Sequence, residues 1–358
     1  MLASYLVPIR SVSAMCVLAI PGLAQIGTLN LPTGTGNDPR SVSFIGNNHV
    51  VVSNQVDGWQ HYVNVSNPAA PTLTTSFNPP YGDQWFEAEY TPAHGGRLIT
   101  GHRGGGLVMV DVSNPATPTV AASVGTIYHY RGLRYLATPV AEYLFYNETN
   151  WGLKVFDLTG GNQLVPGWNN YANATNDGNG LELLGTYLYQ YGSPANAPTT
   201  RELKAFDLVA PATPAQVYFN SSAGVASGNA HVQVRKSPIG PRMLASRYFD
   251  GLDLVDVTNP ASPVTTKIIP ASVDILCWGS FFLPNSVYSV SYGFVRINNV
   301  WQYWWLFMVV PPAGAVVPVY AGPSPMDIHD MSANPATNRI YVVGRNATVL
   351  TQGLLHIY

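Results

Sequence analysis

Short apolar runs rich in β-branched and aromatic residues recur along the whole chain, and Gly, Pro or Asn bounds most of them. Runs of this length with such boundaries are typical of β-strands. Hydrophobic residues make up 46% of the 358 residues, which is enough to bury a sizeable core. The pattern therefore predicts an all-β fold.

One apolar run is repeated together with its flanks. Residues 106–115 read Gly-Leu-Val-Met-Val-Asp-Val-Ser-Asn-Pro, and residues 251–260 read Gly-Leu-Asp-Leu-Val-Asp-Val-Thr-Asn-Pro. Residues 62–68 are a third copy, and weaker copies begin at residues 152, 203, 305 and 353. Because Asn can cap a turn and Pro stops a strand, each copy is expected to be one strand followed by a turn.

The copies are evenly spaced. The positions equivalent to Asp111 are residues 64, 157, 207, 256, 309 and 357, so neighbouring copies lie 46 to 53 residues apart. A unit of that size holds four strands and their turns, which is one propeller blade. The spacing predicts a single closed β-propeller with seven four-stranded blades.

The two ends of the chain predict how the ring closes. Internal copies are followed by a turn and an outer strand, such as residues 119–124, but the last copy stops at Tyr358. Residues 26–31 have a matching apolar pattern and no inner strand before them. We expect this N-terminal strand to complete the last blade, because closure removes an open sheet edge.

The copies resemble the LVIVD repeats of exported bacterial β-propellers. The resemblance covers nearly all of the chain beyond residue 24 and is strongest at residues 104–125 and 250–270. It is weakest at residues 275–320, where residues 294–305 are expected to form an extra hairpin. The resemblance implies a propeller fold and an exported protein.

Residues 1–24 resemble a secretory signal. Arg10 is their only charge, an apolar stretch follows at residues 17–23, and cleavage is expected after Ala24. The stretch is too short to span a bilayer, which takes about 20 residues. We predict a signal peptide at 1–24, a propeller at 25–358, no membrane insertion, and a periplasmic, cell-surface or extracellular location. The alternative for residues 1–24 is a buried N-terminal strand or helix.

Charge is scarce in this chain. Charged residues make up 10% of it and the formal net charge is −2, which argues against a nucleic-acid partner. Cys16 would leave with the signal and Cys277 would remain alone, so no disulfide is expected within the mature chain. The lysines form no basic stripe and are scattered at Lys154, Lys204, Lys236 and Lys267.

The innermost strand of each blade lines the channel of a propeller, and alternate residues face inward. We expect these strands at residues 40–44, 86–90, 131–136, 180–184, 230–234, 273–277 and 326–330. The simplest interpretation of their charged residues is that they pair with one another and hold the blades in register. The channel-lining candidates are Arg40, Glu87, Glu89, Arg131, Arg134, Glu182, His231, Asp274, Asp327 and His329.

Asp327 and His329 are the candidate metal ligands, because residues two apart share one face of a strand. Asp330 is expected on the opposite face. With His231 or Asp274 the pair could bind a divalent metal, or it could act as a general acid and base. The chain has no P-loop, His-Glu-x-x-His, Gly-x-Ser-x-Gly or Ser-x-x-Lys motif. No cofactor is therefore predicted, and a divalent metal in the channel stays as the alternative.

Aromatic residues suggest a second kind of site. Most of those on strands, including residues 303–307, are expected to pack between blades. Tryptophans at predicted strand ends or loops could instead stack on a sugar or on an apolar partner surface. These candidates are Trp59, Trp85, Trp151, Trp168 and Trp278.

Three functions remain open at this point. A secreted or cell-surface module that binds an extracellular protein or glycan fits the export signal, the closed ring and the missing catalytic motifs. An exported hydrolase, such as a lactonase, would use channel His, Asp and Glu residues with or without a metal. A structural component of the envelope or extracellular matrix is the third. Fold analogy alone does not choose among them.

Overall fold

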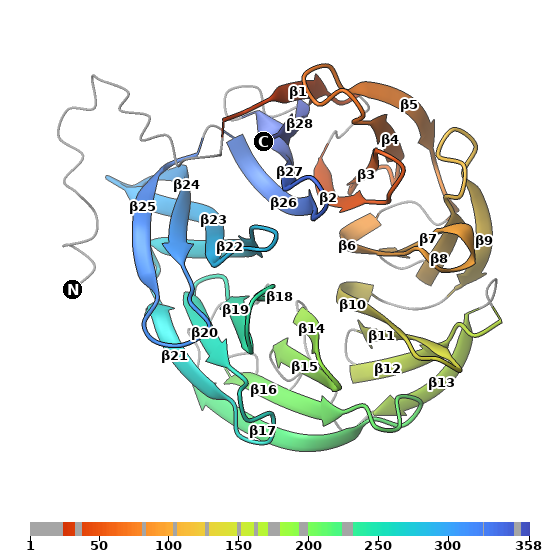
Figure 1. The fold of residues 1–358 in the computed structure, drawn as a ribbon. Helices are drawn as coiled ribbons and strands as arrows, with labels where there is room; N and C mark the ends of the chain where they lie inside the picture. The colour runs from red at the N-terminus through yellow and green to blue at the C-terminus, as the bar shows by residue number, and fades with distance from the viewer. Residues whose placement is uncertain are drawn as a thin grey trace.

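The computed structural model of this chain is a ring of seven four-stranded antiparallel sheets around a central channel (Figure 1). It confirms the predicted single seven-bladed β-propeller. The predicted signal segment lies outside the described residues except for Ala24, and no helix within the described ranges is long and apolar enough to cross a membrane. The structure describes residues 24–32, 38–80, 84–102, 106–125, 129–148, 152–160, 164–170, 180–192, 200–223, 232–324, 326–346 and 352–358.

Each blade runs from an inner strand beside the channel to an outer strand at the rim. Blades 1 and 2 consist of β2 (Pro39–Phe44), β3 (His49–Asn54), β4 (Gln60–Asn64) and β5 (Thr72–Phe77), then β6 (Gln84–Thr91), β7 (Arg97–His102), β8 (Gly106–Asp111) and β9 (Thr119–Val124). Blades 3 and 4 consist of β10 (His129–Ala137), β11 (Glu142–Glu148), β12 (Gly152–Asp157) and β13 (Val165–Asn170), then β14 (Gly180–Leu184), β15 (Tyr187–Gly192), β16 (Thr200–Asp207) and β17 (Ala215–Ala223).

The remaining three blades follow the same order. Blades 5 and 6 consist of β18 (Gln233–Lys236), β19 (Arg242–Ser246), β20 (Leu252–Asp256) and β21 (Val264–Ile269), then β22 (Ile275–Phe282), β23 (Tyr288–Ile297), β24 (Val300–Val309) and β25 (Val317–Pro323). Blade 7 consists of β26 (Met326–Asn334), β27 (Arg339–Asn346), β28 (Gly353–Ile357) and, as its outer strand, β1 (Gly27–Asn30).

The sequence repeat forms the third strand of every blade. These strands end at the positions that the spacing identified, including Asp111 in blade 2. The Asp111 side chain accepts a hydrogen bond from the backbone N–H of Ser113 at 2.9 Å, and Asn114 accepts one from Ala116 at 3.1 Å. Two successive turns of this kind end the strand, and Pro115 prevents the chain from extending it.

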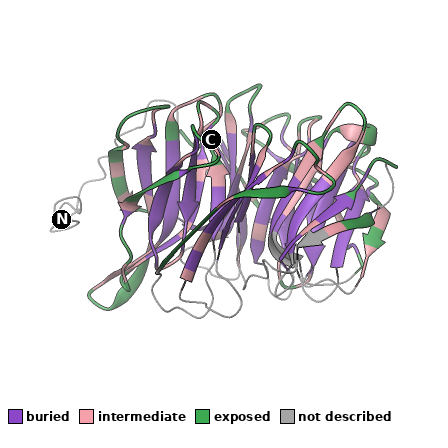
Figure 2. Cartoon of the chain, turned by 90° about the horizontal axis from the view of Figure 1, so that it is seen from below, coloured by how far each residue is buried: buried purple, intermediate pink, exposed green. Residues whose placement is uncertain are grey.

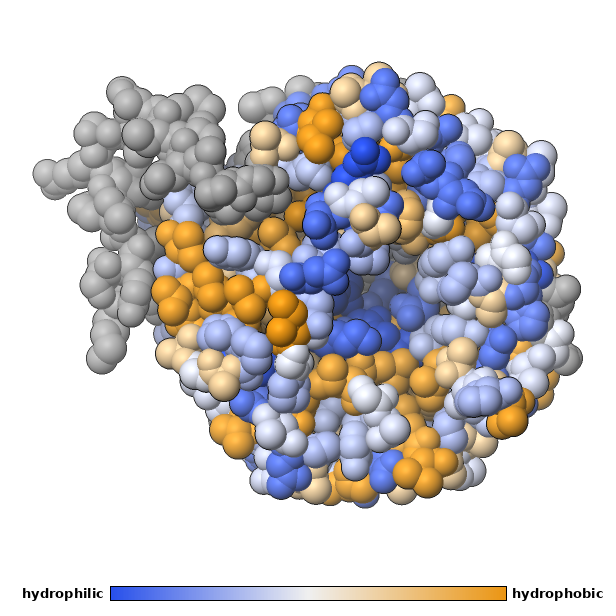
Figure 3. Space-filling view, viewed as in Figure 1, coloured by the Kyte–Doolittle hydropathy of each residue, from blue (hydrophilic) through white to orange (hydrophobic). Residues whose placement is uncertain are grey.

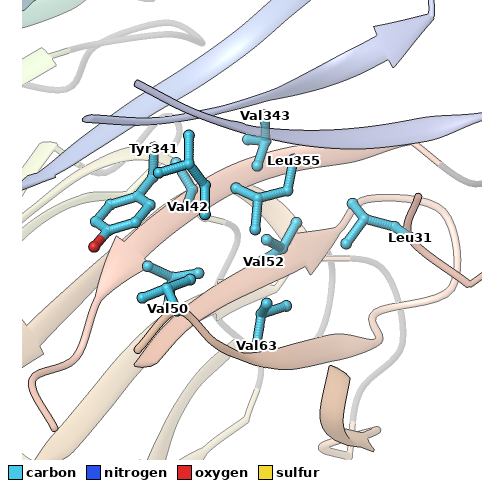
Figure 4. Packing of buried hydrophobic residues seen from close by; sticks show 10 residues of the cluster. Leu31, Val42, Val50, Val52, Val63, Tyr341, Val343 and Leu355 are labelled. Atoms are coloured by element: carbon cyan, nitrogen blue, oxygen red, sulfur yellow. The ribbon is translucent and has the colours of Figure 1, made fainter. Parts of the chain in front are cut away.

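Ring closure occurs as predicted. β1 pairs antiparallel with β28, from Gly27 opposite Ile357 to Asn30 opposite Leu354. Just beyond β1, Leu31 packs with Leu355 of blade 7 and Val42 of blade 1 in one hydrophobic cluster (Figure 4). The N-terminal strand therefore completes the last blade and also seals it against the first.

Hydrophobic packing holds the blades together. A cluster of buried side chains fills each of the seven junctions between neighbouring blades. Figure 2 shows the buried residues concentrated within the strands, with exposed residues at turns and along outer strands. Trp304 and Phe307 are buried in these junctions, whereas Tyr303 stays half-exposed at one end of its strand.

The hairpin expected at residues 294–305 is not a separate element. β23 and β24 are each ten residues long and stay paired up to Ile297 opposite Val300, so the hairpin is the extended end of two blade strands. Asn298 and Asn299 form its turn with φ of 51° and 62°. A two-residue hairpin turn needs positive φ at both central positions, and Asn tolerates it.

The repeat begins with Gly because a side chain does not fit there. Gly251 precedes β20 with φ of +90°, and a Cβ atom on it would lie 2.0 Å from the carbonyl oxygen of Ile269. Gly106 at the start of β8 has φ of +116° and an equally close approach to the carbonyl oxygen of Val124. Both positions need positive φ and a neighbouring strand in close contact.

We predict that Gly251→Ala lowers the free energy of unfolding by about 3 kcal/mol, since it combines backbone strain with a clash. Gly185→Ala is the matched control: Gly185 has φ of +62° but nothing within 4 Å of its Cβ position. The control should lose only about 1 kcal/mol from backbone strain. Urea unfolding followed by tryptophan fluorescence measures both, and equal losses would contradict the steric argument.

Candidate functional site

A belt of charged side chains lines the channel where the inner strands meet, and Figure 3 shows hydrophilic residues around the hollow at the centre of the ring. Arg134 of blade 3 donates to Glu87 of blade 2 at 2.6 Å and lies 3.3 Å from Glu182 of blade 4. Arg235 of blade 5 donates to Glu87 at 2.8 Å and lies 3.6 Å from Asp330 of blade 7. These five charged residues link five blades.

The carboxylates of this belt also bind the backbone of the next blade. Glu87 accepts hydrogen bonds from the N–H groups of Gly132 and Leu133 at 2.8 and 3.2 Å, and Asp330 accepts one from Val42 at 3.1 Å. The inner edge of a blade has backbone donors without a strand partner, and leaving them buried and unpaired would be costly. Each carboxylate therefore serves as an acceptor for a neighbouring sheet edge.

A polar contact of this region joins every pair of neighbouring blades. Counted from the junction of blades 1 and 2 around to that of blades 7 and 1, the pairs are Ser43 with Ala88, Glu87 with Leu133, Arg134 with Glu182, Lys236 with Glu182, Ser280 with Gln233, Tyr292 with His329, and Val42 with Asp330.

Bulges on the inner strands redirect several side chains of the site. In β26 the pairing register shifts between Ile328 and Asp330, so His329 is an extra residue. Asp327 lies opposite Arg345 and Asp330 opposite Val343, which puts the two aspartates on one face of the sheet. The expectation that Asp330 faces away from Asp327 is thus wrong, because the bulge resets the alternation.

Arg40 in β2 and Trp278 in β22 are bulged in the same way. The register shifts between Pro39 and Ser41 and between Cys277 and Gly279. Bulges re-aim side chains and are common next to functional sites. Here they bring residues of blades 6 and 1 together: the Arg40 guanidinium carbon lies 5.5 Å from the centre of the Trp278 ring.

The two candidate metal ligands are in contact. His329 Nε2 lies 3.0 Å from Asp327 Oδ2, and His329 Nδ1 lies 2.6 Å from the carbonyl oxygen of Pro39. Arg345 donates to Asp327 at 2.6 Å. Both ring nitrogens of His329 and one oxygen of Asp327 therefore already have protein partners.

Burial and the nearby Arg40 lower the pKa of His329, so its imidazole is neutral at pH 7. Burial alone would raise the pKa of Asp327, but His329 and Arg345 together lower it. No group of three or more metal-binding side chains is found among the described residues. A divalent metal bound to His329 would have to replace the Asp327 or the Pro39 partner of one ring nitrogen.

Three other channel candidates are not among the residues of this belt. Asp274 does not join the belt: its side chain is 54% exposed and lies 2.6 Å from Arg296 at the β23–β24 hairpin. The reason is that β22 begins at Ile275, so Asp274 lies in the turn before the channel strand. The side chain of Arg131 and all of His231 lie outside the described residues.

The tryptophan candidates are placed differently from one another. Trp59 is 37% exposed in the turn after β3, whereas Trp168 belongs to β13 and packs against a buried cluster. Trp278 is half-buried in β22, the inner strand of blade 6, and packs against the cluster between blades 6 and 7. The side chain of Trp85 and all of Trp151 lie outside the part of the chain that the structure describes.

Six aromatic side chains of blades 5 and 6 form a continuous band, which we call the aromatic strip. Neighbouring rings have centroids 4.7 to 6.4 Å apart, in tilted or edge-to-face arrangements that aromatic pairs favour. A guanidinium lies over each of its two tryptophans, Arg40 over Trp278 and Arg296 over Trp301. The strip consists of Tyr248, Phe249, Trp278, Phe294, Trp301 and Tyr303.

Local backbone geometry fixes the middle of the strip. Tyr248 has φ of 52° and exchanges two backbone hydrogen bonds with Cys277, which holds the β19–β20 turn against β22. Trp301 follows the Asn-Asn turn and is 41% exposed. Inspection of the sequence missed Tyr248, Phe249 and Trp301. The Asn298-Asn299 turn was the available signal, because it marks the tip on which Trp301 stands.

One carboxyl group of the channel titrates near neutral pH. Burial raises the pKa of Glu89 to about 7, against the opposing effect of Arg134. Glu89 accepts the backbone N–H of Tyr135 at 3.2 Å and keeps 24% of its side chain exposed. Glu87 behaves differently: burial would raise its pKa, but Arg134 and Arg235 lower it well below the ordinary value.

We predict that Glu89→Gln becomes more stable relative to wild type as the pH rises from 5 to 8, by about 2 kcal/mol. Because its pKa is raised on folding, Glu89 contributes stability while protonated, and that contribution is lost as the pH passes 7. Urea midpoints at each pH measure the difference. The control is Glu202→Gln. Glu202 lies outside the belt and pairs with Lys204 at 2.8 Å. A pH-independent difference for Glu89→Gln would overturn the assignment.

For the metal alternative, we predict well below one divalent metal per chain in elemental analysis of the purified protein, because both ring nitrogens of His329 already have protein partners. Asp327→Ala and His329→Ala should leave the metal content unchanged. Near-stoichiometric calcium or transition metal that both variants lose would instead identify these residues as ligands.

Comparison with known proteins agrees with this architecture. A family model for the LVIVD repeat matches residues 100–126 and 249–269, which contain the third strands β8 and β20 of blades 2 and 5. None of the curated proteins compared with the chain matches it. The chain is therefore a seven-bladed β-propeller that contains LVIVD repeats in blades 2 and 5.

Proposed function

We propose that this protein is an exported binding module that holds an extracellular protein or glycan against its aromatic strip. The observation that carries the proposal is the strip itself, a continuous and partly exposed row of six rings. Exposed aromatic groups of this size mark binding surfaces in monomeric proteins, and Trp, Tyr and Arg supply most hot-spot energy.

The ion pairs of the channel also favour a binding site at the strip over one in the channel. Glu87, Arg134 and Glu182 are mostly buried and bonded to one another, and Glu87 also binds the backbone of the next blade. A ligand that used these groups would compete with contacts between blades. A ligand that binds the exposed rings of the strip would not compete with these ion pairs.

Export rests on the sequence. The signal-like residues 1–24 and the resemblance to LVIVD-repeat propellers both favour it, and a neutral, Asn- and Thr-rich surface suits an extracellular location. A periplasmic, cell-surface or secreted protein would meet glycans and other proteins at this face.

An exported hydrolase is the second candidate, and one observation favours it. Glu89 has a pKa of about 7 and is partly exposed, which suits a general acid or base. Its carboxylate also accepts the Tyr135 N–H and so contributes to a blade junction. The binding module is the function we put forward.

We predict that Trp301→Ala weakens binding to glycan or extracellular-protein arrays at least about tenfold, the loss typical of an aromatic hot spot. Trp59→Ala is the matched control, because Trp59 is similarly exposed (37% against 41%) but lies outside the strip. Array retention followed by surface plasmon resonance measures both. Unchanged binding in Trp301→Ala, or an equal loss in the two variants, would contradict the proposal.

A further inference from the structure

We infer that the ligand is a neutral saccharide and that its primary subsite lies where Trp278 meets the ion pairs Asp38–Arg40 and Asp327–Arg345. This inference rests on the proposed binding function and names the class of ligand. Three neighbouring blades build the subsite, since Trp278 belongs to blade 6, Asp327 and Arg345 to blade 7, and Arg40 to blade 1.

The first element of the subsite is an arginine that lies over an indole ring and is held by an ion pair. Arg40 donates to Asp38 Oδ2 through Nε at 2.9 Å and through Nη2 at 2.7 Å, while its guanidinium lies over the Trp278 ring. The ion pair fixes the orientation of the guanidinium before any ligand arrives. Fixed planar donors beside an aromatic ring lose little entropy on binding.

The second element of the subsite is the Arg345 guanidinium, which can still donate hydrogen bonds to a ligand. Arg345 donates to Asp327 Oδ2 through Nε at 3.1 Å and through Nη2 at 2.6 Å. Its Nη1 group donates to none of the described residues, and 28% of its side chain is exposed. Arg345 can therefore donate to a ligand hydroxyl without releasing Asp327.

Tyr303 of β24, the last ring of the aromatic strip, supplies a further polar group. Burial raises its pKa, with Asp327 adding to the effect and Arg345 opposing it, so the phenol lies within electrostatic reach of that ion pair. Its ring packs on Phe294 at 5.1 Å, and its hydroxyl bonds to no described residue. A phenol is both donor and acceptor, as a sugar hydroxyl is.

A similar combination recurs at the other tryptophan of the strip. Arg296 lies over Trp301 at 5.6 Å and its Nη2 is 2.6 Å from Asp274. Each of the two tryptophans thus has an Arg–Asp pair beside it, although the two sets come from different strands. Tyr248 and Phe249 join the two tryptophans by ring contacts at 6.0, 4.7 and 6.1 Å, so linked sugars could lie along the strip.

Two physical arguments favour a neutral saccharide. A pyranose ring has an apolar C–H face that packs on aromatic rings, and hydroxyls at its rim that pair with planar polar groups, which is the combination found here. The charges also cancel, since two guanidiniums face two carboxylates. The repulsion of an acidic sugar by Asp38 and Asp327 would oppose its attraction to the two guanidiniums. A negative charge on the sugar would therefore bring no net electrostatic gain.

The test is titration of the purified mature protein, by calorimetry and by tryptophan fluorescence, with defined hexasaccharides. The neutral probes are cellohexaose, maltohexaose, xylohexaose and mannohexaose, and the acidic probes are oligogalacturonate and a heparin hexasaccharide. We expect at least one neutral probe to bind. Trp278→Ala and Arg345→Met should each weaken that binding at least tenfold, and Arg345→Lys should weaken it less than Arg345→Met.

Controls separate loss of the subsite from loss of the fold. Trp59→Ala and Arg339→Met, the latter at the other end of β27, should bind like wild type. Each variant is compared with wild type by circular dichroism and thermal midpoint, and Arg345→Lys covers the case in which Arg345→Met does not fold. Binding of acidic probes only, or neutral binding that Trp278→Ala and Arg345→Met leave intact, overturns the subsite.

The same titration distinguishes this inference from the proposed function. Retention on a protein array that Trp301→Ala abolishes, with no saccharide bound, rejects the saccharide and keeps the binding module. No binding to saccharides or to protein arrays rejects both.

Discussion

The inner strand of each blade has backbone N–H groups on its free edge that no further strand can accept. The stability of the ring depends on other acceptors for these groups. Acidic and amide side chains of neighbouring blades accept several of these hydrogen bonds, as Glu87 does for Leu133 and Asp330 for Val42. Buried carboxylates are costly unless they are paired, and Arg134 and Arg235 supply the compensating charge. A chain with 10% charged residues therefore gathers many of them in its channel.

The use of charged side chains to join the blades limits where a ligand can bind. Residues committed to joining blades are poor candidates for ligand contact, because a ligand would have to replace bonds that hold the ring. The rings of the aromatic strip are not part of the Glu87–Arg134–Arg235–Asp330 belt, and Trp301 lies near the tip of an extended hairpin, where it is 41% exposed. The Glu87–Arg134–Arg235–Asp330 belt thus serves stability, and the strip with its neighbouring ion pairs serves binding.

Sequence reasoning was accurate wherever structure follows from local chemistry. The Asp-Val-Ser-Asn-Pro turn, the Gly at the start of each full repeat and the spacing of copies predicted blade number, strand order and ring closure. It erred at Asp330 and at Asp274. A bulge at His329 reverses the alternation for Asp330, and a strand that starts two residues later than expected puts Asp274 in a turn.

By itself the sequence determined the seven-bladed propeller, because each blade is built from contacts within about 50 residues and the repeat recurs at that period. Only the tertiary structure decided which side chains form the site. Arg40 lies over Trp278 because ring closure places blade 1 beside blade 7, near blade 6, and because bulges turn both side chains toward the same place. No local sequence pattern predicts the contact between Arg40 and Trp278, because that contact depends on where the ends of the chain join.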